Sequence, residues 1–179
     1  NLAIVTFQTM DNIRVAKTIE PLQISASNVT DGPYIFVDAH NSLSAVSIQN
    51  GSLQKKQFSS EQGSWKIPTS IPSVRTIEIE SIEEPIPPAT FTMPPCLLAI
   101  SDLEGNLDHL LQFLQFHDVI DAQYNWSWGT NHLLFNGDSV DRGTQVTELL
   151  WFMRKLQQQA RTAGGRVHVV IGNHEAMIL

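Results

Sequence analysis

The chain has 179 residues and a formal net charge of −7 at pH 7. Its 42% hydrophobic and 16% charged residues are typical of a globular protein and argue against a disordered chain. An acidic chain repels polyanions, so nucleic acid is not expected as a partner. No apolar run approaches the roughly 20 residues that span a bilayer, so no membrane partner is expected. A soluble protein is predicted; whether it is cytoplasmic or exported after signal removal stays open.

Residues 1–92 have the pattern of short strands separated by turns. Alternating or β-rich segments predict strands at residues 13–19, 33–37, 45–48, 53–58 and 74–82. Asp31–Gly32 is expected to form a turn before the second of these, and Asn50–Gly51 a two-residue hairpin after the third. We therefore expect a small β-rich accessory domain, either a sandwich or an open barrel, over residues 1–92.

A proline-rich segment follows and separates two parts with different patterns. Its prolines are Pro85, Pro87, Pro88, Pro94 and Pro95. Proline fixes φ and pushes the preceding residue into an extended conformation, so this segment is expected to be a stiff connector. The single cysteine, Cys96, opens the apolar run that follows it and is expected to lie in the core.

The second part alternates strands and helices. Strands are predicted at residues 96–101, 132–135 and 167–171, the first of them buried on both faces. Helices are predicted from residue 107 to 116 and from about Val146 to the stop at Gly164–Gly165. Strand, loop and helix in this order predict an α/β layer with a mostly parallel sheet.

Each predicted strand ends in a polar loop. The loops are Asp102-x-Glu104-Gly105-Asn106, Gly137-Asp138-x-x-Asp141-Arg142-Gly143 and Gly172-Asn173-His174-Glu175. Carboxyl ends of parallel strands meet at one edge of a sheet, so the three loops are expected to converge. Carboxylate and amide oxygens suit hard divalent ions, arginine grips phosphate in a bidentate manner, and a histidine oriented by a carboxylate can protonate a leaving oxygen.

These three loops resemble those of the calcineurin-like metallophosphoesterase superfamily, and the Asp-Arg-Gly and Asn-His-Glu endings are most similar to its phosphoprotein phosphatase branch. The resemblance covers residues 96–179 and implies that residues 93–179 form the N-terminal half of a metallophosphoesterase domain with an α/β layered sheet. It implies a metal-dependent hydrolase of phosphate monoesters, with phosphoserine and phosphothreonine as the expected substrates. Two metal ions would activate the attacking water. Manganese is the expected metal, with iron, zinc or magnesium as alternatives.

The resemblance also implies roles for individual residues. Asp102 and Glu104 bind the first metal ion, Asp138 bridges both ions, and Asn173 binds the second. His174 is the catalytic acid and Asp141 orients it. Arg142 holds the substrate phosphate, together with Asn173 and His174. Glu175 braces the site, with Arg142 as one partner it could pair with, and Asn106 either contacts phosphate or caps a helix.

Two departures from the family pattern matter. The family has Asp-x-His where this chain has Asp102-x-Glu104, so Glu104 either binds metal or turns away from it. The family also has two histidine ligands downstream of the third loop, which we expect from a missing C-terminal segment or from a partner chain. The phosphorylated substrate could be a protein or a small molecule. A dinucleoside polyphosphate hydrolase and a binding module that kept the fold without catalysis stay as alternatives.

Overall fold

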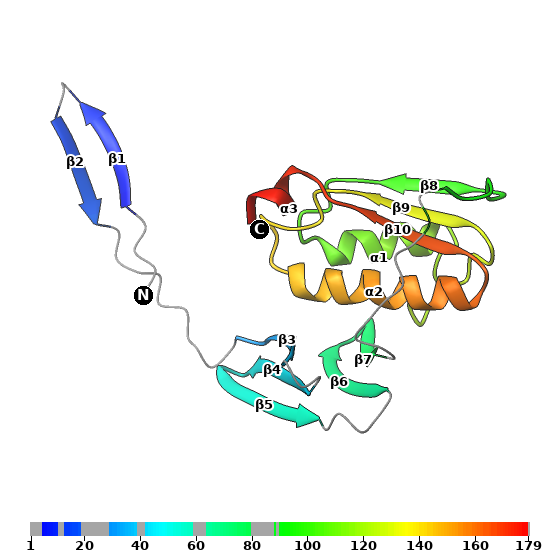
Figure 1. Cartoon of the computed structure of the whole chain (residues 1–179). Coiled ribbons are helices and arrows are strands. Elements are labelled where there is room, and N and C mark those ends of the chain that lie inside the picture. Colours follow the sequence, from blue (N-terminus) through cyan, green and yellow to red (C-terminus); the bar gives the residue numbers. More distant parts are fainter. Residues whose placement is uncertain are drawn as a thin grey trace.

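The computed structural model describes residues 5–10, 13–18, 29–38, 42–58, 64–79, 88 and 90–178. Within these residues the N-terminal part consists of strands and the C-terminal part of alternating strands and helices (Figure 1). The N-terminal strands are β1 (Val5–Met10), β2 (Ile13–Thr18), β3 (Asp31–Val37), β4 (Leu43–Gln49), β5 (Ser52–Phe58), β6 (Trp65–Ile71) and β7 (Val74–Ile79). The elements that follow are β8 (Leu97–Ile100), α1 (Leu107–Phe116), β9 (His132–Asn136), α2 (Val146–Thr162), β10 (Arg166–Val170) and α3 (Asn173–Ile178).

The hairpin predicted at Asn50–Gly51 is confirmed. Asn50 has a φ of 49° and Gly51 a φ of 76°, and these two residues join β4 to β5 in an antiparallel pair. Positive φ at both central residues is the conformation that matches the right-handed twist of the flanking strands. This turn is fixed by its own two residues, which is why the local sequence sufficed to predict it.

The turn predicted at Asp31–Gly32 is wrong, because both residues lie inside β3. The register of β3 on β4 shifts between Asp31 and Tyr34, which marks a bulge. Gly32 has a φ of +96°, and a Cβ there would lie 3.0 Å from the Val46 carbonyl oxygen. Glycine is needed here for a close approach of two strands rather than for a chain reversal.

A single sandwich or open barrel is not found among the described strands. They form separate antiparallel sheets, with orders β1-β2, β3-β4-β5 and β6-β7. Strand β6 was not predicted, because Pro68 interrupts a segment whose apolar residues alternate weakly. The burial of Trp65, Ile67 and Ile71 becomes understandable only from the packing of the β6–β7 hairpin on the helices. Of the proline-rich connector, Pro85 and Pro87 lie outside the described residues.

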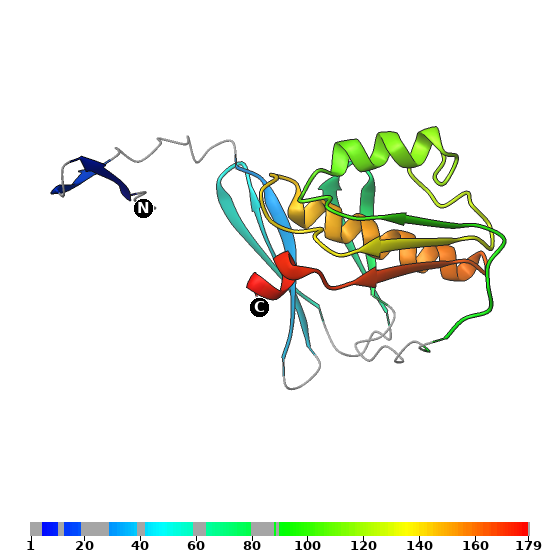
Figure 2. The ribbon, with the colours of Figure 1, turned by 90° about the horizontal axis from the view of Figure 1, so that it is seen from above.

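The α/β layer predicted for the second part is confirmed. Strands β8, β9 and β10 pair in parallel in the order β10-β9-β8 (Figure 2), and α1 and α2 lie on the same face of this sheet (Figure 1). Successive right-handed crossovers between neighbouring strands place their helices on one face. All three strands therefore point the same way, and the loops after them lie at one edge. No helix among the described residues is both long and apolar enough to cross a membrane.

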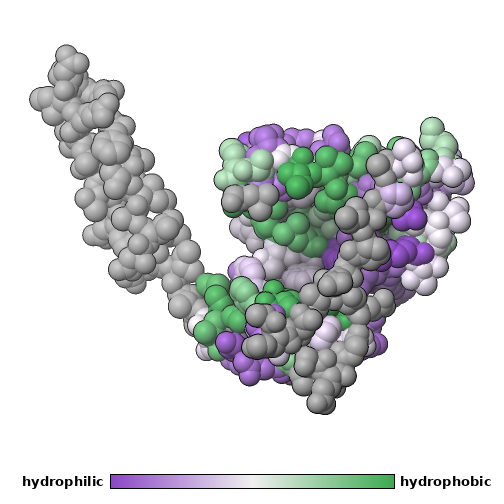
Figure 3. Space-filling model, viewed as in Figure 1, coloured by the Kyte–Doolittle hydropathy of each residue, from purple (hydrophilic) through white to green (hydrophobic). Residues whose placement is uncertain are grey.

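Strand β8 differs from its prediction, since it is an edge strand and not buried on both faces. Leu97 is 54% exposed, and Cys96 is exposed rather than in the core. The reason is that, among the described elements, helices cover only one face of the sheet. Apolar side chains at the end of β10 and in the segment leading to α3, including Val170 and Ile171, therefore remain exposed (Figure 3). Among the described residues, this three-stranded layer therefore has an open edge and an apolar face that no helix covers.

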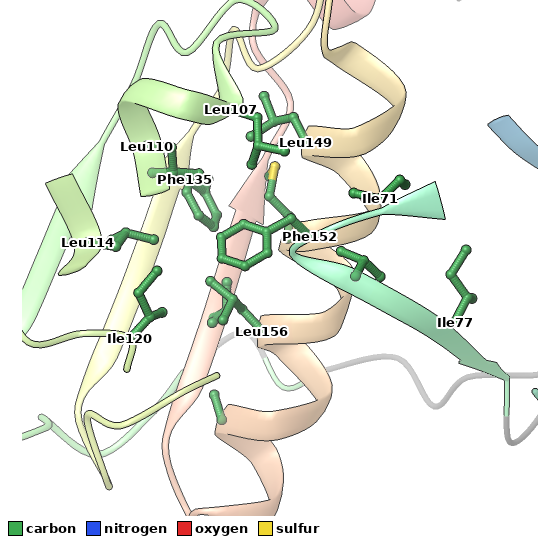
Figure 4. Close-up of a cluster of buried hydrophobic side chains, with 14 of the residues drawn as sticks. Ile71, Ile77, Leu107, Leu110, Leu114, Ile120, Phe135, Leu149, Phe152 and Leu156 are labelled. Atoms are coloured by element: carbon green, nitrogen blue, oxygen red, sulfur yellow. The ribbon is translucent and has the colours of Figure 1, made fainter. Parts of the chain in front are cut away.

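The hydrophobic core lies between the sheet and the two helices and continues beyond α2. Phe135 from β9 and Phe152 from α2 are fully buried at its centre (Figure 4). Ile71 and Ile77 of the β6–β7 hairpin belong to the same cluster of buried side chains. The hairpin therefore shares one core with the α/β layer.

Hydrogen bonds also connect the β-rich part to α2. Trp151 Nε1 donates to the Pro33 carbonyl, Lys155 Nζ to the Ser73 carbonyl and Gln158 Nε2 to the Glu78 carbonyl, each at 2.9 Å. The three donors are spaced four and three residues apart, so they lie on one face of the helix. These contacts connect the strands of the β-rich part to α2. That residues 1–92 form a separate accessory domain stays a prediction.

Candidate active site at the carboxyl edge of the sheet

The loops after β8 and β9 contain several residues other than glycine with left-handed backbones. Positive φ angles occur at Asp102 (57°), Glu104 (47°), Asp138 (52°), Asp141 (75°) and Arg142 (57°). Residues other than glycine adopt this conformation at a cost of the order of 1 kcal/mol each, and such residues cluster at functional sites. The strained positions coincide with the polar residues that the sequence singled out.

Backbone hydrogen bonds join the first loop to the second. The amide of Glu104 donates to the Asp138 carbonyl at 3.0 Å, and the amide of Gly143 donates back to the Glu104 carbonyl at 2.8 Å. A Cβ at position 143 would lie 2.3 Å from that same carbonyl oxygen. Gly143 is therefore required for the two loops to approach, and their contact places the Glu104 and Arg142 side chains next to each other.

Glu175 joins the third loop to the second. One of its carboxylate oxygens accepts from the amides of Gly172 (2.7 Å) and Asp138 (2.9 Å), and the other accepts from the amides of Ser139 (2.7 Å) and Val140 (3.3 Å). Burial raises the pKa of Glu175, but these amides together outweigh burial and hold the pKa below its ordinary value. The pairing with Arg142 considered from sequence is not formed.

Replacing Glu175 with glutamine is expected to destabilise the protein by about 1.5–3 kcal/mol, because the amide NH₂ group cannot accept from the backbone amides it would face. Because the pKa of Glu175 is lowered in the folded state, its carboxylate stabilises the fold at pH values above the pKa of an ordinary carboxyl group. This contribution is lost as the pH falls through the folded-state pKa. Urea denaturation at several pH values measures both effects. Glu78→Gln removes an exposed partner of Lys66 and is the matched control, with an expected change below about 1 kcal/mol. Equal stability of the two variants would contradict the bracing role.

The backbone of the third loop is fixed on Asp138. The amide of His174 donates to Asp138 Oδ1 at 2.9 Å, at the start of α3. A Cβ on Gly172 would lie 2.3 Å from the same oxygen, so this glycine lets the third loop come close to the carboxylate. Helix α3 was not predicted, since only six residues form it.

His174 lies between a carboxylate and a guanidinium. Its Nδ1 is 3.3 Å from Asp141 Oδ2, and its Nε2 is 3.4 Å from Arg142 Nη2. A carboxylate only accepts and a guanidinium only donates, so the neutral ring with its proton on Nδ1 satisfies both contacts. The Arg142 amide, followed by the contact with His174, holds the pKa of Asp141 below its ordinary value, so this carboxylate stays ionised opposite the ring.

Arg142 makes its shortest side-chain contact with Glu104. Arg142 Nη1 lies 2.6 Å from Glu104 Oε1, and the Arg142 side chain is more exposed (63%) than that of Glu104 (20%). The sequence contained both residues but no signal that they pair, because 38 positions of chain separate them and only the contact between the two loops brings them together.

The oxygen donors at this edge are chemically suited to a divalent ion. Asp102, Glu104, Asp138 and Asn173 lie in the three converging loops, and carboxylate and amide oxygens are ligands that hard cations prefer. Next to Asp138, the buried Ser139 hydroxyl finds no hydrogen-bond partner among the described residues. Within the described residues, however, no three His, Cys, Asp or Glu side chains are grouped closely enough to hold an ion. The donor types fit a metal site, and the described side chains do not by themselves enclose one.

The three loops and the parallel sheet are similar to those of a known family. Residues 97–178 match the family model described as calcineurin-like phosphoesterase, which confirms the resemblance found in the loops. This segment of the chain is therefore similar to the calcineurin-like phosphoesterases.

Two relatives of this segment are named as phosphatases. The chain is 36% identical over 87 residues to Shewanella-like protein phosphatase 2 of Arabidopsis thaliana, covering 49% of the chain and 22% of the relative. It is 34% identical over 83 residues to Shewanella-like protein phosphatase 1 of Plasmodium berghei, covering 46% of the chain and 23% of the relative. The chain thus spans about a quarter of the length of these curated relatives.

Solved structures extend the likeness into the β-rich part. The cold-active protein-tyrosine phosphatase of a psychrophile Shewanella sp. superposes with a TM-score of 0.71 and 36% identity, over 84% of this chain and 45% of that chain. Since residues 97–178 make up less than half of the chain, the superposition includes strands of the β-rich part. Those strands are therefore common to the two structures.

Proposed function

We propose that the protein is a metal-dependent phosphatase that hydrolyses phosphate monoesters on proteins. The observation that carries the proposal is the row of contacts from Asp141 through His174 to Arg142, held beside Asp138 at the carboxyl edge of the sheet. The family match of residues 97–178 and the phosphatase names of the relatives support it.

The residues of the chain have distinct tasks in this proposal. Arg142 binds two phosphate oxygens through its planar fork of donors. His174 delivers a proton to the leaving oxygen, and Asp141 keeps the ring oriented. Water attacks phosphorus in line with the leaving oxygen, and no covalent phospho-enzyme forms. Glu175 keeps the second and third loops together, so that His174 and Arg142 face the same phosphate.

Asp102, Glu104, Asp138 and Asn173 are the proposed metal ligands, with manganese as the expected ion and Asp138 shared between two ions. When bound, the ions supply Lewis-acid activation of water and neutralise the charge that develops on phosphate.

The phosphorylated residue is proposed to be serine or threonine. Phosphotyrosine is a second candidate, since the solved relatives that cover 84% of the chain are named protein-tyrosine phosphatase. A dinucleoside polyphosphate hydrolase would use the same loops. A binding module without catalysis has no need of a histidine held between Asp141 and Arg142.

Hydrolysis by EDTA-treated protein, with and without Mn²⁺, tests the proposal. Three peptides of one sequence, phosphorylated on serine, threonine or tyrosine, are compared with p-nitrophenyl phosphate and diadenosine tetraphosphate. Mn²⁺-dependent release of phosphate from the peptides is expected, with the serine or threonine peptide preferred. Preference for the tyrosine peptide would select the second candidate, cleavage of the dinucleotide alone would select the third, and no turnover of any substrate would contradict the proposal.

A further inference from the structure

Both terminal nitrogens of Arg142 already have partners in this structure. Nη1 is 2.6 Å from Glu104 Oε1, and Nη2 is 3.4 Å from His174 Nε2. Bidentate recognition of phosphate uses this same pair of nitrogens. A carboxylate is therefore paired with one of the two nitrogens that would bind phosphate, and a histidine ring contacts the other.

The backbones of the two loops bring Glu104 and Arg142 close together. Glu104 and Arg142 both have left-handed backbones, and Gly143, next to Arg142, donates its amide to the Glu104 carbonyl. The Glu104 side chain is largely shielded from solvent, whereas Arg142 is exposed. Glu104 is thus the fixed partner, and the phosphate would have to displace it from the guanidinium.

Glu104 is also one of the four oxygen donors proposed as metal ligands. Its carboxylate can bind a metal cation or pair with Arg142. The cation and the guanidinium therefore compete for the same carboxylate. We propose that Glu104 withholds Arg142 from phosphate until a divalent cation engages the carboxylate, so that phosphate binding follows metal binding. The inference rests on the proposed function, because it assumes that Arg142 binds substrate phosphate.

Two consequences distinguish this role from that of an ordinary ligand. A residue that only binds metal would leave phosphate affinity unchanged in the metal-free protein, whereas a residue that occupies Arg142 lowers it. Because coupling between two sites is reciprocal, phosphate should also tighten metal binding in the wild-type protein. Glutamine at position 104 removes the charge and keeps the shape, and aspartate keeps the charge.

Calorimetric titration of the metal-free protein with inorganic phosphate tests the inference. Glu104→Gln is expected to bind phosphate roughly two- to fivefold more tightly than wild type, the range of a partly exposed ion pair, and Glu104→Asp is expected to stay near wild type. In an Arg142→Ala background the gain from Glu104→Gln should disappear. Equal affinity of wild type and Glu104→Gln would overturn the inference, as would a gain that persists without Arg142.

A second measurement needs no variant at position 104. In wild-type protein, saturating Mg²⁺ should shift the nitrogen-15 resonances of the Arg142 guanidinium, and an unchanged signal would overturn the inference. Titration with phosphate in the presence of Mg²⁺ distinguishes the role of Glu104 from the proposed function. If wild type binds phosphate with Mg²⁺ but metal-free Glu104→Gln binds it no more tightly than metal-free wild type, only the role of Glu104 is contradicted. If no variant binds phosphate with Mg²⁺, the proposed function is contradicted as well.

Discussion

Replacing His174 with alanine is expected to lower kcat by about 10²–10⁴-fold, the range typical of a positioned general acid. His174 is 7% exposed and is held from two sides by Asp141 and Arg142, so no other group in the described loops takes its place. The loss should be larger for phenyl phosphate than for p-nitrophenyl phosphate. Nitrophenolate is a weaker base than phenolate and leaves more readily without a proton.

Steady-state kinetics on the two esters with Mn²⁺ measure this effect. His109→Ala, which removes an exposed histidine of α1, is the matched control and should keep wild-type rates. Metal content of His174→Ala should equal that of wild type, since the proposed ligands remain. An equal loss on both esters would indicate a structural defect rather than a missing acid, and unchanged turnover would show that His174 is not the acid.

Replacing Phe152 with alanine is expected to destabilise the protein by about 3–5 kcal/mol, through lost apolar burial and the cavity left behind. Phe152 is fully buried in the core cluster that includes Leu149 and Leu156 (Figure 4). The effect should reach the β6–β7 hairpin, because Ile71 and Ile77 belong to the same cluster.

Urea denaturation followed by circular dichroism measures the free energy of unfolding. Phe116→Ala is the matched control, because Phe116 ends α1 and is 83% exposed. It should cost less than about 1 kcal/mol, as expected of surface positions. If Phe152→Ala were no more destabilising than Phe116→Ala, the shared core described for the α/β layer and the β6–β7 hairpin would be wrong.

Features fixed by neighbouring residues could be predicted from the sequence. Helix α1 was predicted at its observed bounds, because Leu107, Leu110 and Leu114 repeat with the helical period and face the core. The Asn50–Gly51 hairpin and the parallel pairing of β8, β9 and β10 likewise follow from local turn chemistry and from the strand–helix–strand order of the chain. The roles of the site residues stay predictions, although the structure brings their loops together.

Features fixed by contacts between distant segments could not be predicted. The apolar run after Cys96 resembles a buried strand, but β8 lies at an edge whose outer face the described elements leave bare. The segment of β6 is stabilised by packing on the core that α2 shares. The Glu104–Arg142 ion pair depends on two loops whose glycines allow their backbones to touch.

The most direct test of the metal-dependent site is the number of Mn²⁺ ions that the purified protein retains after dialysis, determined by elemental analysis. Asp138→Ala removes the residue proposed to bridge two ions, and Asp108→Ala removes an exposed aspartate in the first turn of α1 as its control. We expect two ions per molecule in wild type and in Asp108→Ala, and fewer than one in Asp138→Ala. Retention of no Mn²⁺ by wild type, or of equal amounts by Asp138→Ala, would contradict a metal site at the carboxyl edge of this sheet.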